Sequence, residues 1–147
     1  MRKPAATFAV PTTIEPGLDR VLHYWNHLKR GENNVPFADD VNLPDLQELA
    51  KDAFLLESFE KPLRFRLDII GDNIAARYGH AVTGKFIDEV EMHAPFDSLA
   101  EQCTRAVRKR TPTYYRNEAA RYARLALPLW ENGRVELVLV AMTGSGD

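Results

Sequence analysis

The last strand-like segment of the chain, Val135–Met142, is apolar at nearly every position. It is far shorter than the roughly 18 apolar residues that a membrane span requires. In an antiparallel sheet, a strand with one wet face alternates apolar and polar residues, so a continuous run predicts a central strand covered on both faces. The fold must therefore place a layer on each side of a sheet.

Four other segments have the pattern of strands. "TPTYYRNE" and "AARYARLALPLW" precede the last strand, which "ENG" joins to its neighbour in a hairpin with Gly133. Earlier, "AFLLESFE" and "LRFRLDII" predict a hairpin joined by the Lys61-Pro62 turn. In its second strand, Leu63, Phe65, Leu67 and Ile69 alternate with charged residues. We expect a five-stranded antiparallel sheet from residues 53–70 and 112–142.

Helical spacing predicts helices before and between these strands. The first runs from Pro16 to about Arg30, where Gly31 ends it. A short second helix is expected at 43–52, one or two turns at 72–78, and a third substantial helix at 94–110. The helices between the strands cover one face of the sheet, and the initial helices cover the other. This order predicts an α+β fold.

Composition excludes several classes of protein. At 147 residues, with 45% hydrophobic and 27% charged residues, the chain is an ordinary globular domain. Its net charge of -2 gives no basic surplus for nucleic acid. No apolar run reaches the length of a membrane span, and the first residues contain no apolar core of signal-peptide length. The single cysteine, Cys103, excludes an intrachain disulfide and fits a reducing cytoplasm. We expect a cytoplasmic protein without nucleic-acid or membrane partners.

"GHAVTGKF" at 79–86 matches the spacing of a nucleotide-binding loop. That chemistry needs a hydroxyl after the lysine to hold magnesium, but Phe86 follows Lys85. It also needs a helix there, and the segment before Pro95 is too short for one. We therefore interpret Gly79 and Gly84 as turn residues and Lys85 as a surface residue.

A series of motifs accompanies the order of elements. They are Trp25-x-x-Leu28 with Gly31 and Pro36, Leu43-Pro44 before "FLLE", "RFRL" at 64–67, Tyr78-Gly79, Thr83-Gly84, and the closing "RLALPLWENGRVELVLVAM". Together they resemble stand-alone bacterial PAS proteins with an N-terminal helical extension. The resemblance implies a PAS fold, with an N-terminal arm and helical cap at 1–46 and the PAS core at 47–147. It also implies a sensory or regulatory role.

A second fold remains open at this point. Ketosteroid-isomerase-like proteins also build a pocket on a curved antiparallel sheet behind initial helices. Strand order separates the two, because in a PAS domain the last strand lies beside the first in the centre of the sheet.

Neither a cofactor nor a metal is expected. Haem-binding PAS domains place a ligand histidine on the long helix, whereas His93 falls just before it here. Cys103 lies mid-helix, as a small core residue does, and not in the position of a flavin-reactive cysteine. His23 and His27 have metal-compatible spacing, but they flank a packing tryptophan and are interpreted as surface residues.

Four side chains could approach an inner cavity and bind a ligand: Arg66, Tyr78, Tyr115 and Arg124. An arginine on a sheet could hold a carboxylate or phosphate bidentately. The alternative is that these side chains are solvated or paired with Asp and Glu across strands. Which face of each strand points inward is not fixed by the sequence.

We expect a non-enzymatic sensor or adaptor of bacterial signalling, which binds a small molecule, a protein partner or both. Because the chain ends soon after its last strand, at Asp147, it is expected to signal by docking. The alternative is a small isomerase or hydratase with Asp68 or Asp88 as the base. A buried carboxylate with a raised pKa would favour that enzyme.

A homodimer is also expected through the first helix, whose stripe comprises Leu18, Leu22, Trp25 and Leu28. Burying these side chains between two chains would supply apolar contact area, partly offset by association entropy. The competing interpretation is that the helix folds back on its own sheet.

Overall fold

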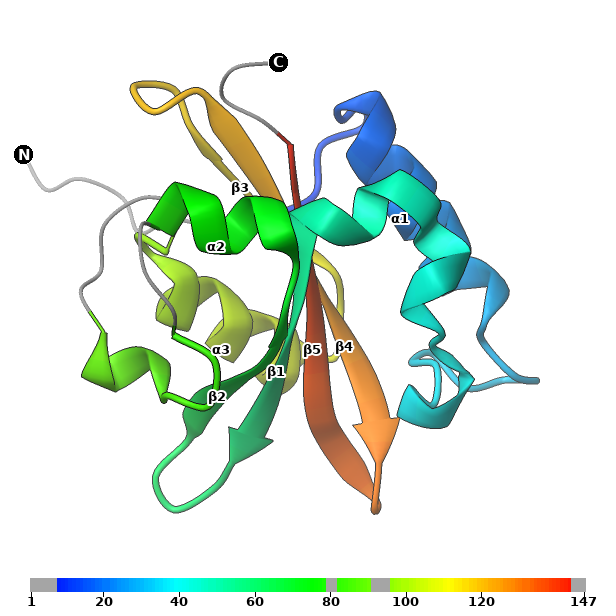
Figure 1. Cartoon of the computed structure of the whole chain (residues 1–147). Coiled ribbons are helices and arrows are strands. Elements are labelled where there is room, and N and C mark those ends of the chain that lie inside the picture. The colour runs from blue at the N-terminus through cyan, green and yellow to red at the C-terminus, as the bar shows by residue number, and fades with distance from the viewer. Residues whose placement is uncertain (1–7, 79–81, 91–95, 144–147) are drawn as a thin grey trace, which may run out of the picture.

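A five-stranded antiparallel sheet lies at the centre of the computed structural model, which describes residues 8–78, 82–90 and 96–143 (Figure 1). The strands are β1 (Ala53–Phe59), β2 (Arg64–Ile70), β3 (Thr113–Asn117), β4 (Tyr122–Glu131) and β5 (Arg134–Thr143). Their order is β2-β1-β5-β4-β3. The last strand lies beside the first in the centre, which confirms the arrangement expected for the PAS fold.

The apolar run of β5 is explained by its place in the sheet. Leu139 faces Leu55 of β1 on one side and Leu127 of β4 on the other. Its neighbours Val138 and Val140 point to the opposite face, and all three β5 side chains are fully buried. Both faces of this strand are covered, as the sequence predicted.

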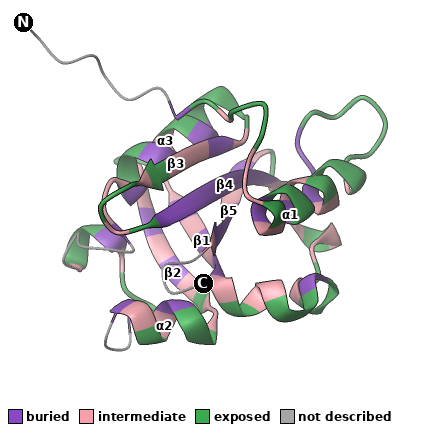
Figure 2. Ribbon diagram, turned by 90° about the horizontal axis from the view of Figure 1, so that it is seen from above, coloured by how far each residue is buried: buried purple, intermediate pink, exposed green. Residues whose placement is uncertain are grey.

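One face, here called the inner face, is covered by α2 (Asp72–Tyr78), the short 3-10 helix η3 (Ile87–Glu89) and α3 (Leu99–Lys109). Figure 2 shows that the buried side of α3 faces the sheet. The side chains that fill the space between include Phe54, Phe65, Ile74, Tyr78, Phe96, Leu99 and Cys103. The third helix begins at Leu99, later than expected, after Ser98 with φ of 59°.

The outer face is covered by α1 (Pro16–His27) and the 3-10 helices η1 (Ala38–Asp40) and η2 (Leu43–Asp52). Leu18, Val21 and Trp25 pack against β4 and β5. The indole Nε1 of Trp25 donates to the carbonyl oxygen of Pro128 at 2.8 Å. Helix α1 ends at His27, earlier than expected, where Leu28 N–H turns back to the carbonyl of Trp25.

The apolar stripe of α1 is therefore covered within one chain. Trp25 is 2% exposed and Leu18 1% exposed, whereas Leu22 and Leu28 are half-buried. This is the competing interpretation given above, and it removes two of the four side chains from the expected dimer surface. The homodimer itself stays a prediction.

The expected division between residues 46 and 47 also stays a prediction. The segment η2 spans it with a kink at Gln47, whose φ is 55°, and Leu46 is buried against the sheet together with the side chains of α1. Within the described ranges, no helix combines the length and the apolar character needed to cross a bilayer.

The segment after α2 pairs with the free edge of β2. Gly84 N–H donates to the carbonyl of Leu67 at 2.6 Å, and Leu67 N–H donates to the carbonyl of Lys85 at 2.9 Å. Gly84 has φ of +86°, a conformation that favours glycine, and Lys85 is exposed. Gly79 lies outside the described residues. The described part of this segment is thus a turn with a surface lysine, as expected, and only the three-residue η3 follows it.

The opposite edge of the sheet also contacts a segment of the same chain. Tyr114 N–H in β3 donates to the carbonyl of Phe8 at 2.9 Å. The ring of Phe8 lies 6.2 Å from that of Tyr115 between centroids. The N-terminal segment is thereby held against β3.

Candidate functional site

Tyr115 and Arg124 lie together on the inner face of the sheet. They are direct partners in the pairing of β3 with β4, and the guanidinium carbon of Arg124 lies 4.7 Å from the centroid of the Tyr115 ring. Tyr78, from the end of α2, belongs to the same inner core, where its ring stacks on Phe96 at 4.9 Å. The structure thus places three of the four expected ligand-binding residues on the inner face.

Arg124 is fully buried and is held by α3 and by the segment before it. Its Nε donates to Oε1 of Gln102 at 2.6 Å, and its Nη2 donates to the backbone carbonyl of Asp97 at 2.8 Å. The Gln102 amide in turn donates to the carbonyls of Thr113 and Arg124. Burial lowers the pKa of Arg124, because the charged form loses its hydration.

Asp97 accepts hydrogen bonds from two strands. Its Oδ2 accepts from the Tyr115 hydroxyl at 2.6 Å and from Nδ2 of Asn117 at 2.9 Å, and its Oδ1 accepts from the Tyr122 hydroxyl. Burial by itself would raise the pKa of Asp97, but these hydrogen bonds, with the charge of Arg124, hold it below its ordinary value. Asp97 is therefore ionised at neutral pH.

The pKa values of the two tyrosines are shifted in the opposite direction from that of Asp97. Burial raises the pKa of Tyr115 and of Tyr122, and the hydrogen bond of each to Asp97 raises it further. Burial also raises the pKa of the Cys103 thiol to about 12. We call Asp97, Gln102, Tyr115, Tyr122 and Arg124 the Asp97 cluster.

The Asp97 cluster is suited to binding an anion and not to acid–base catalysis. Two phenol hydroxyls donate to a carboxylate there, and a guanidinium donates to the backbone carbonyl of the same residue; hydroxyl and guanidinium donors are those that carboxylates and phosphates prefer. At present the carboxylate is that of the protein's own Asp97. The pKa of Asp97 is lowered and those of Tyr115 and Tyr122 are raised, so these three groups are shifted away from the neutral range in which a general acid or base works.

Arg66 lies on the opposite, outer face. Its Nε donates to Oδ1 of Asp68 at 2.7 Å, and its Nη2 donates to Oε1 of Glu57 at 2.8 Å. Phe65 and Leu67, its neighbours in β2, point into the inner core. Arg66 is thus paired with acidic side chains along and across strands, the alternative interpretation given above, and is not brought together with the other three.

The carboxylates of the enzyme alternative lie near the surface. The Asp88 side chain is 52% exposed, and Arg64 donates to it through two nitrogens, at 2.7 and 2.9 Å. The hydrogen bond from Arg64 lowers the pKa of Asp88. Asp68 is half-buried and ion-paired with Arg66. Neither one is a buried carboxylate.

The candidate metal and cofactor residues have ordinary surroundings. His23 and His27 are exposed on α1, and Cys103 is buried in the core of α3. His93 lies outside the described residues. Among the residues that the structure does describe, no group of three or more His, Cys, Asp or Glu side chains is placed to hold a metal.

Sequence reasoning missed Asp97, Gln102 and Tyr122. Tyr122 carried a signal, because it stands two residues before Arg124 and so shares its face of β4. Asp97 and Gln102 carried none, since their distance from β4 is set by how α3 packs on the sheet.

Comparison with known proteins agrees with this fold. The family model described as a PAS domain matches residues 14–131, and thus α1, α2, α3 and β1 to β4. Searches of curated proteins and of solved structures return no match. PAS domains are generally sensory and not catalytic. The family match covers most of the chain and agrees with the strand order, so the chain belongs to the PAS domain family.

Proposed function

We propose that this protein is a non-enzymatic regulatory PAS domain of bacterial signalling that acts by binding. The observation that carries the proposal is the Asp97 cluster, where two tyrosine hydroxyls hold the carboxylate of Asp97 and the guanidinium of Arg124 holds its backbone carbonyl. Family membership supports a sensory role, and the surface positions of Asp68 and Asp88 argue against the pocket enzyme.

The cluster suggests how a ligand would be sensed. Asp97 stands two residues before α3, and its hydrogen bonds connect the entry of that helix to β3 and β4. A small acidic molecule that took the donors of Tyr115 and Arg124 would release Asp97. Because Gln102 lies on α3 and bonds to Arg124, the same exchange would change how the helix is held. We infer that Tyr115 and Arg124 contact the ligand, and that Tyr78 lines the apolar part of the site.

Native mass spectrometry of the full chain as purified tests the proposal. Tyr115→Phe removes one donor of the cluster, and Tyr114→Phe is its matched control. Tyr114 is the next residue of the same strand, faces the outer side and also bonds to a carboxylate, that of Glu15. We expect a bound small molecule whose occupancy falls in Tyr115→Phe and is unchanged in Tyr114→Phe. If no adduct is found, succinate and benzoate are titrated in a thermal-shift assay with the same variants.

Two results would overturn parts of this proposal. A wild-type chain that carries no adduct and is stabilised by neither acid would reject ligand sensing through the cluster. A bound molecule that the protein converts into a product with turnover would reject the non-enzymatic role.

A further inference from the structure

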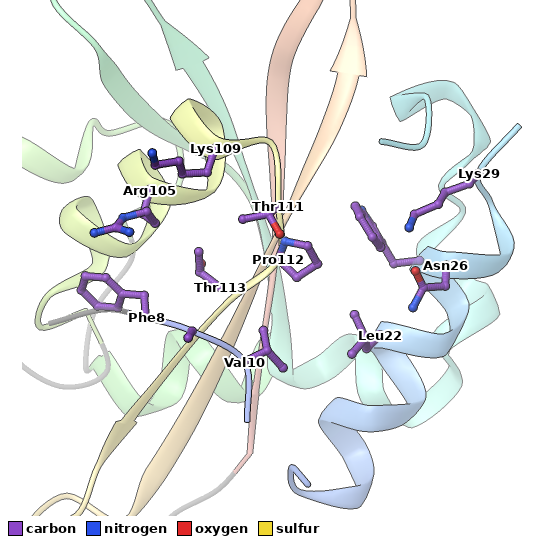
Figure 3. Close-up of a pocket in the computed structure, with 12 residues that line it drawn as sticks. Phe8, Val10, Leu22, Asn26, Lys29, Arg105, Lys109, Thr111, Pro112 and Thr113 are labelled. Carbon is purple, nitrogen blue, oxygen red and sulfur yellow. The ribbon is translucent and has the colours of Figure 1, made fainter. Parts of the chain in front are cut away.

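A surface groove lies between the N-terminal segment, α1 and the C-terminal end of α3, outside the Asp97 cluster (Figure 3). Its volume is about 630 Å³. Apolar side chains of three separate segments line it: Phe8 and Val10, Leu22 and Trp25, and Pro112. Val10 and Leu22 are half-buried, so part of their apolar surface remains open to an occupant.

Cationic side chains stand on both sides of this groove. Lys29 projects from the end of α1 on one side, and Arg105 and Lys109 project from α3 on the other (Figure 3). All three are exposed. The ammonium of Lys29 lies 4.6 Å from the ring centroid of Trp25, so a positive charge sits directly over the apolar floor.

Ion pairing separates these three cations from several arginines in the described parts of the chain. Several arginines elsewhere pair with a carboxylate: Arg30 with Asp40, Arg64 with Asp88, Arg66 with Glu57 and Arg116 with Glu15. Within the described residues, no ion pair includes Lys29, Arg105 or Lys109. The chain carries a net charge of -2, so this positive charge is a local concentration.

The groove continues along α3. An adjoining hollow of about 520 Å³ shares Phe8, Arg105 and Lys109 with it. A second hollow of about 500 Å³ shares Lys109 and reaches Trp130, where the guanidinium carbon of Arg110 lies 5.1 Å from the ring centroid. Two of the three hollows are thus lined by a tryptophan with a cation over its ring. Three hollows that share lining residues suit an extended chain better than a compact small molecule.

We propose that the groove binds an acidic amphipathic segment of a partner protein. An apolar side chain of that segment would pack on Leu22 and Val10, and carboxylates on either side would reach Lys29 and Lys109. Complementary charge would steer the encounter, and burial of the apolar side chain would provide the anchor. This inference rests on the proposed function and names the class of partner.

The groove and the Asp97 cluster share one helix. Gln102 of α3 is buried and holds Arg124, whereas Arg105 and Lys109 of the same helix are exposed and line the groove. A change in how α3 is held at Gln102 would move two of the three cations. Helix α3 would thereby connect the ligand site to the partner site.

Fluorescence anisotropy of a labelled peptide with alternating Glu and Leu pairs tests the groove, with the same peptide carrying Gln for Glu as its control. The full-length chain is compared with Lys29→Glu/Lys109→Glu and with Lys51→Glu/Lys85→Glu. Both double variants change the net charge equally, and Lys51 and Lys85 are exposed and do not line the groove. Circular dichroism melts establish that each is folded, and Lys29→Gln supplies a milder change at the same place.

We expect the acidic peptide to bind and the Gln peptide to bind at least about tenfold more weakly. The groove variant should lose about tenfold in affinity and the control variant about twofold or less, with weaker binding at higher salt. Leu22→Ala should weaken binding without changing its salt dependence.

Four results would overturn the inference: no binding of the acidic peptide, equal losses in both double variants, stronger competition by phosphatidylserine vesicles or single-stranded DNA, or a wild-type dimer that the groove variant dissociates. The last would assign the groove to a second copy of the chain. None of these four results changes what native mass spectrometry would show for the wild type and for Tyr115→Phe. Conversely, turnover of a bound ligand would leave the binding isotherm of the peptide unchanged. Failure of the inference is thus distinguishable from failure of the proposed function.

Discussion

The two faces of the sheet each carry an arginine, and the two arginines differ in burial and in hydrogen-bond partners. On the inner face, Arg124 is fully buried and bonds to a glutamine and a backbone carbonyl under the ring of Tyr115. On the outer face, Arg66 remains partly exposed and bonds to two carboxylates. The inner arginine donates to the neutral Gln102 side chain and to a backbone carbonyl. The outer arginine is already neutralised.

The largest effect is expected from removing the inner arginine. Arg124→Ala leaves Gln102 Oε1 and the Asp97 carbonyl without their donor and opens a cavity, so the free energy of unfolding should fall by about 4 kcal/mol. Urea denaturation measures it. Arg124→Met, which keeps most of the volume without the charge, should lose less. Arg66→Ala should change stability little, and a comparable loss there would contradict the contrast between the faces.

A smaller loss is expected where α1 covers the outer face. Trp25→Ala removes a buried ring and its hydrogen bond to Pro128, and should lower the free energy of unfolding by about 3 kcal/mol. The value falls at the low end for aromatic truncation because the adjacent groove admits water into the space. Sedimentation at micromolar concentration is the second measurement. A wild-type dimer that this change converts into an equally stable monomer would show that α1 pairs two chains.

Gly71 connects β2 to α2 and packs against the end of η2. A Cβ at this position would stand 2.5 Å from the carbonyl oxygens of Ala50 and Lys51 at the end of η2. Because that contact is with backbone, Gly71→Ala should lower the free energy of unfolding by about 2 kcal/mol. Gly84→Ala is the control, since its Cβ would meet open space and only the positive φ would cost about 1 kcal/mol. If Gly84→Ala lowered the melting temperature more than Gly71→Ala did, the close backbone packing at Gly71 would be contradicted.

The smallest effect compares adjacent tyrosines on the two faces. Tyr115→Phe should cost about 1 kcal/mol at neutral pH, because one hydrogen bond to the Asp97 carboxylate is lost. The pKa of Asp97 is lowered by folding, so its contribution is present above the ordinary aspartate value, about 4, and is lost as pH falls through the folded pKa. The difference from wild type should therefore shrink on acidification. Stability measured from neutral to acid pH, with Tyr114→Phe alongside, would contradict this if the difference stayed constant.

Most of the fold was predictable because periodicity reports how many faces of a strand are covered. The apolar run at Val135–Met142 indicated a central strand, and the alternation in "LRFRL" indicated a strand with one buried face. The site was predictable only in part. The same alternation sets Arg66 opposite Phe65 and Leu67, but the sequence did not reveal that those two face α2 and α3. Arg124 stood out as a charge within an otherwise apolar strand.

The remaining members of the site depend on tertiary packing. Asp97 reaches β3 and β4 only because of the position at which α3 packs on the inner face of the sheet. No local sequence pattern encodes that position. The ends of α1 and α3 were also misplaced by a few residues, since backbone hydrogen bonds at a helix end respond to the loop that follows.

The two backbone contacts at the margins of the sheet bear on how the protein resists aggregation. An exposed outermost strand is a template on which a strand of another molecule can add, and such addition propagates into fibrils. Here Gly84 and Lys85 occupy the middle of the β2 edge, and the carbonyl of Phe8 takes a donor of β3. Growth of the sheet by a foreign strand must first displace a segment of the chain's own backbone at either side. Both edges of the sheet thus have part of their backbone hydrogen-bonding capacity satisfied within the chain.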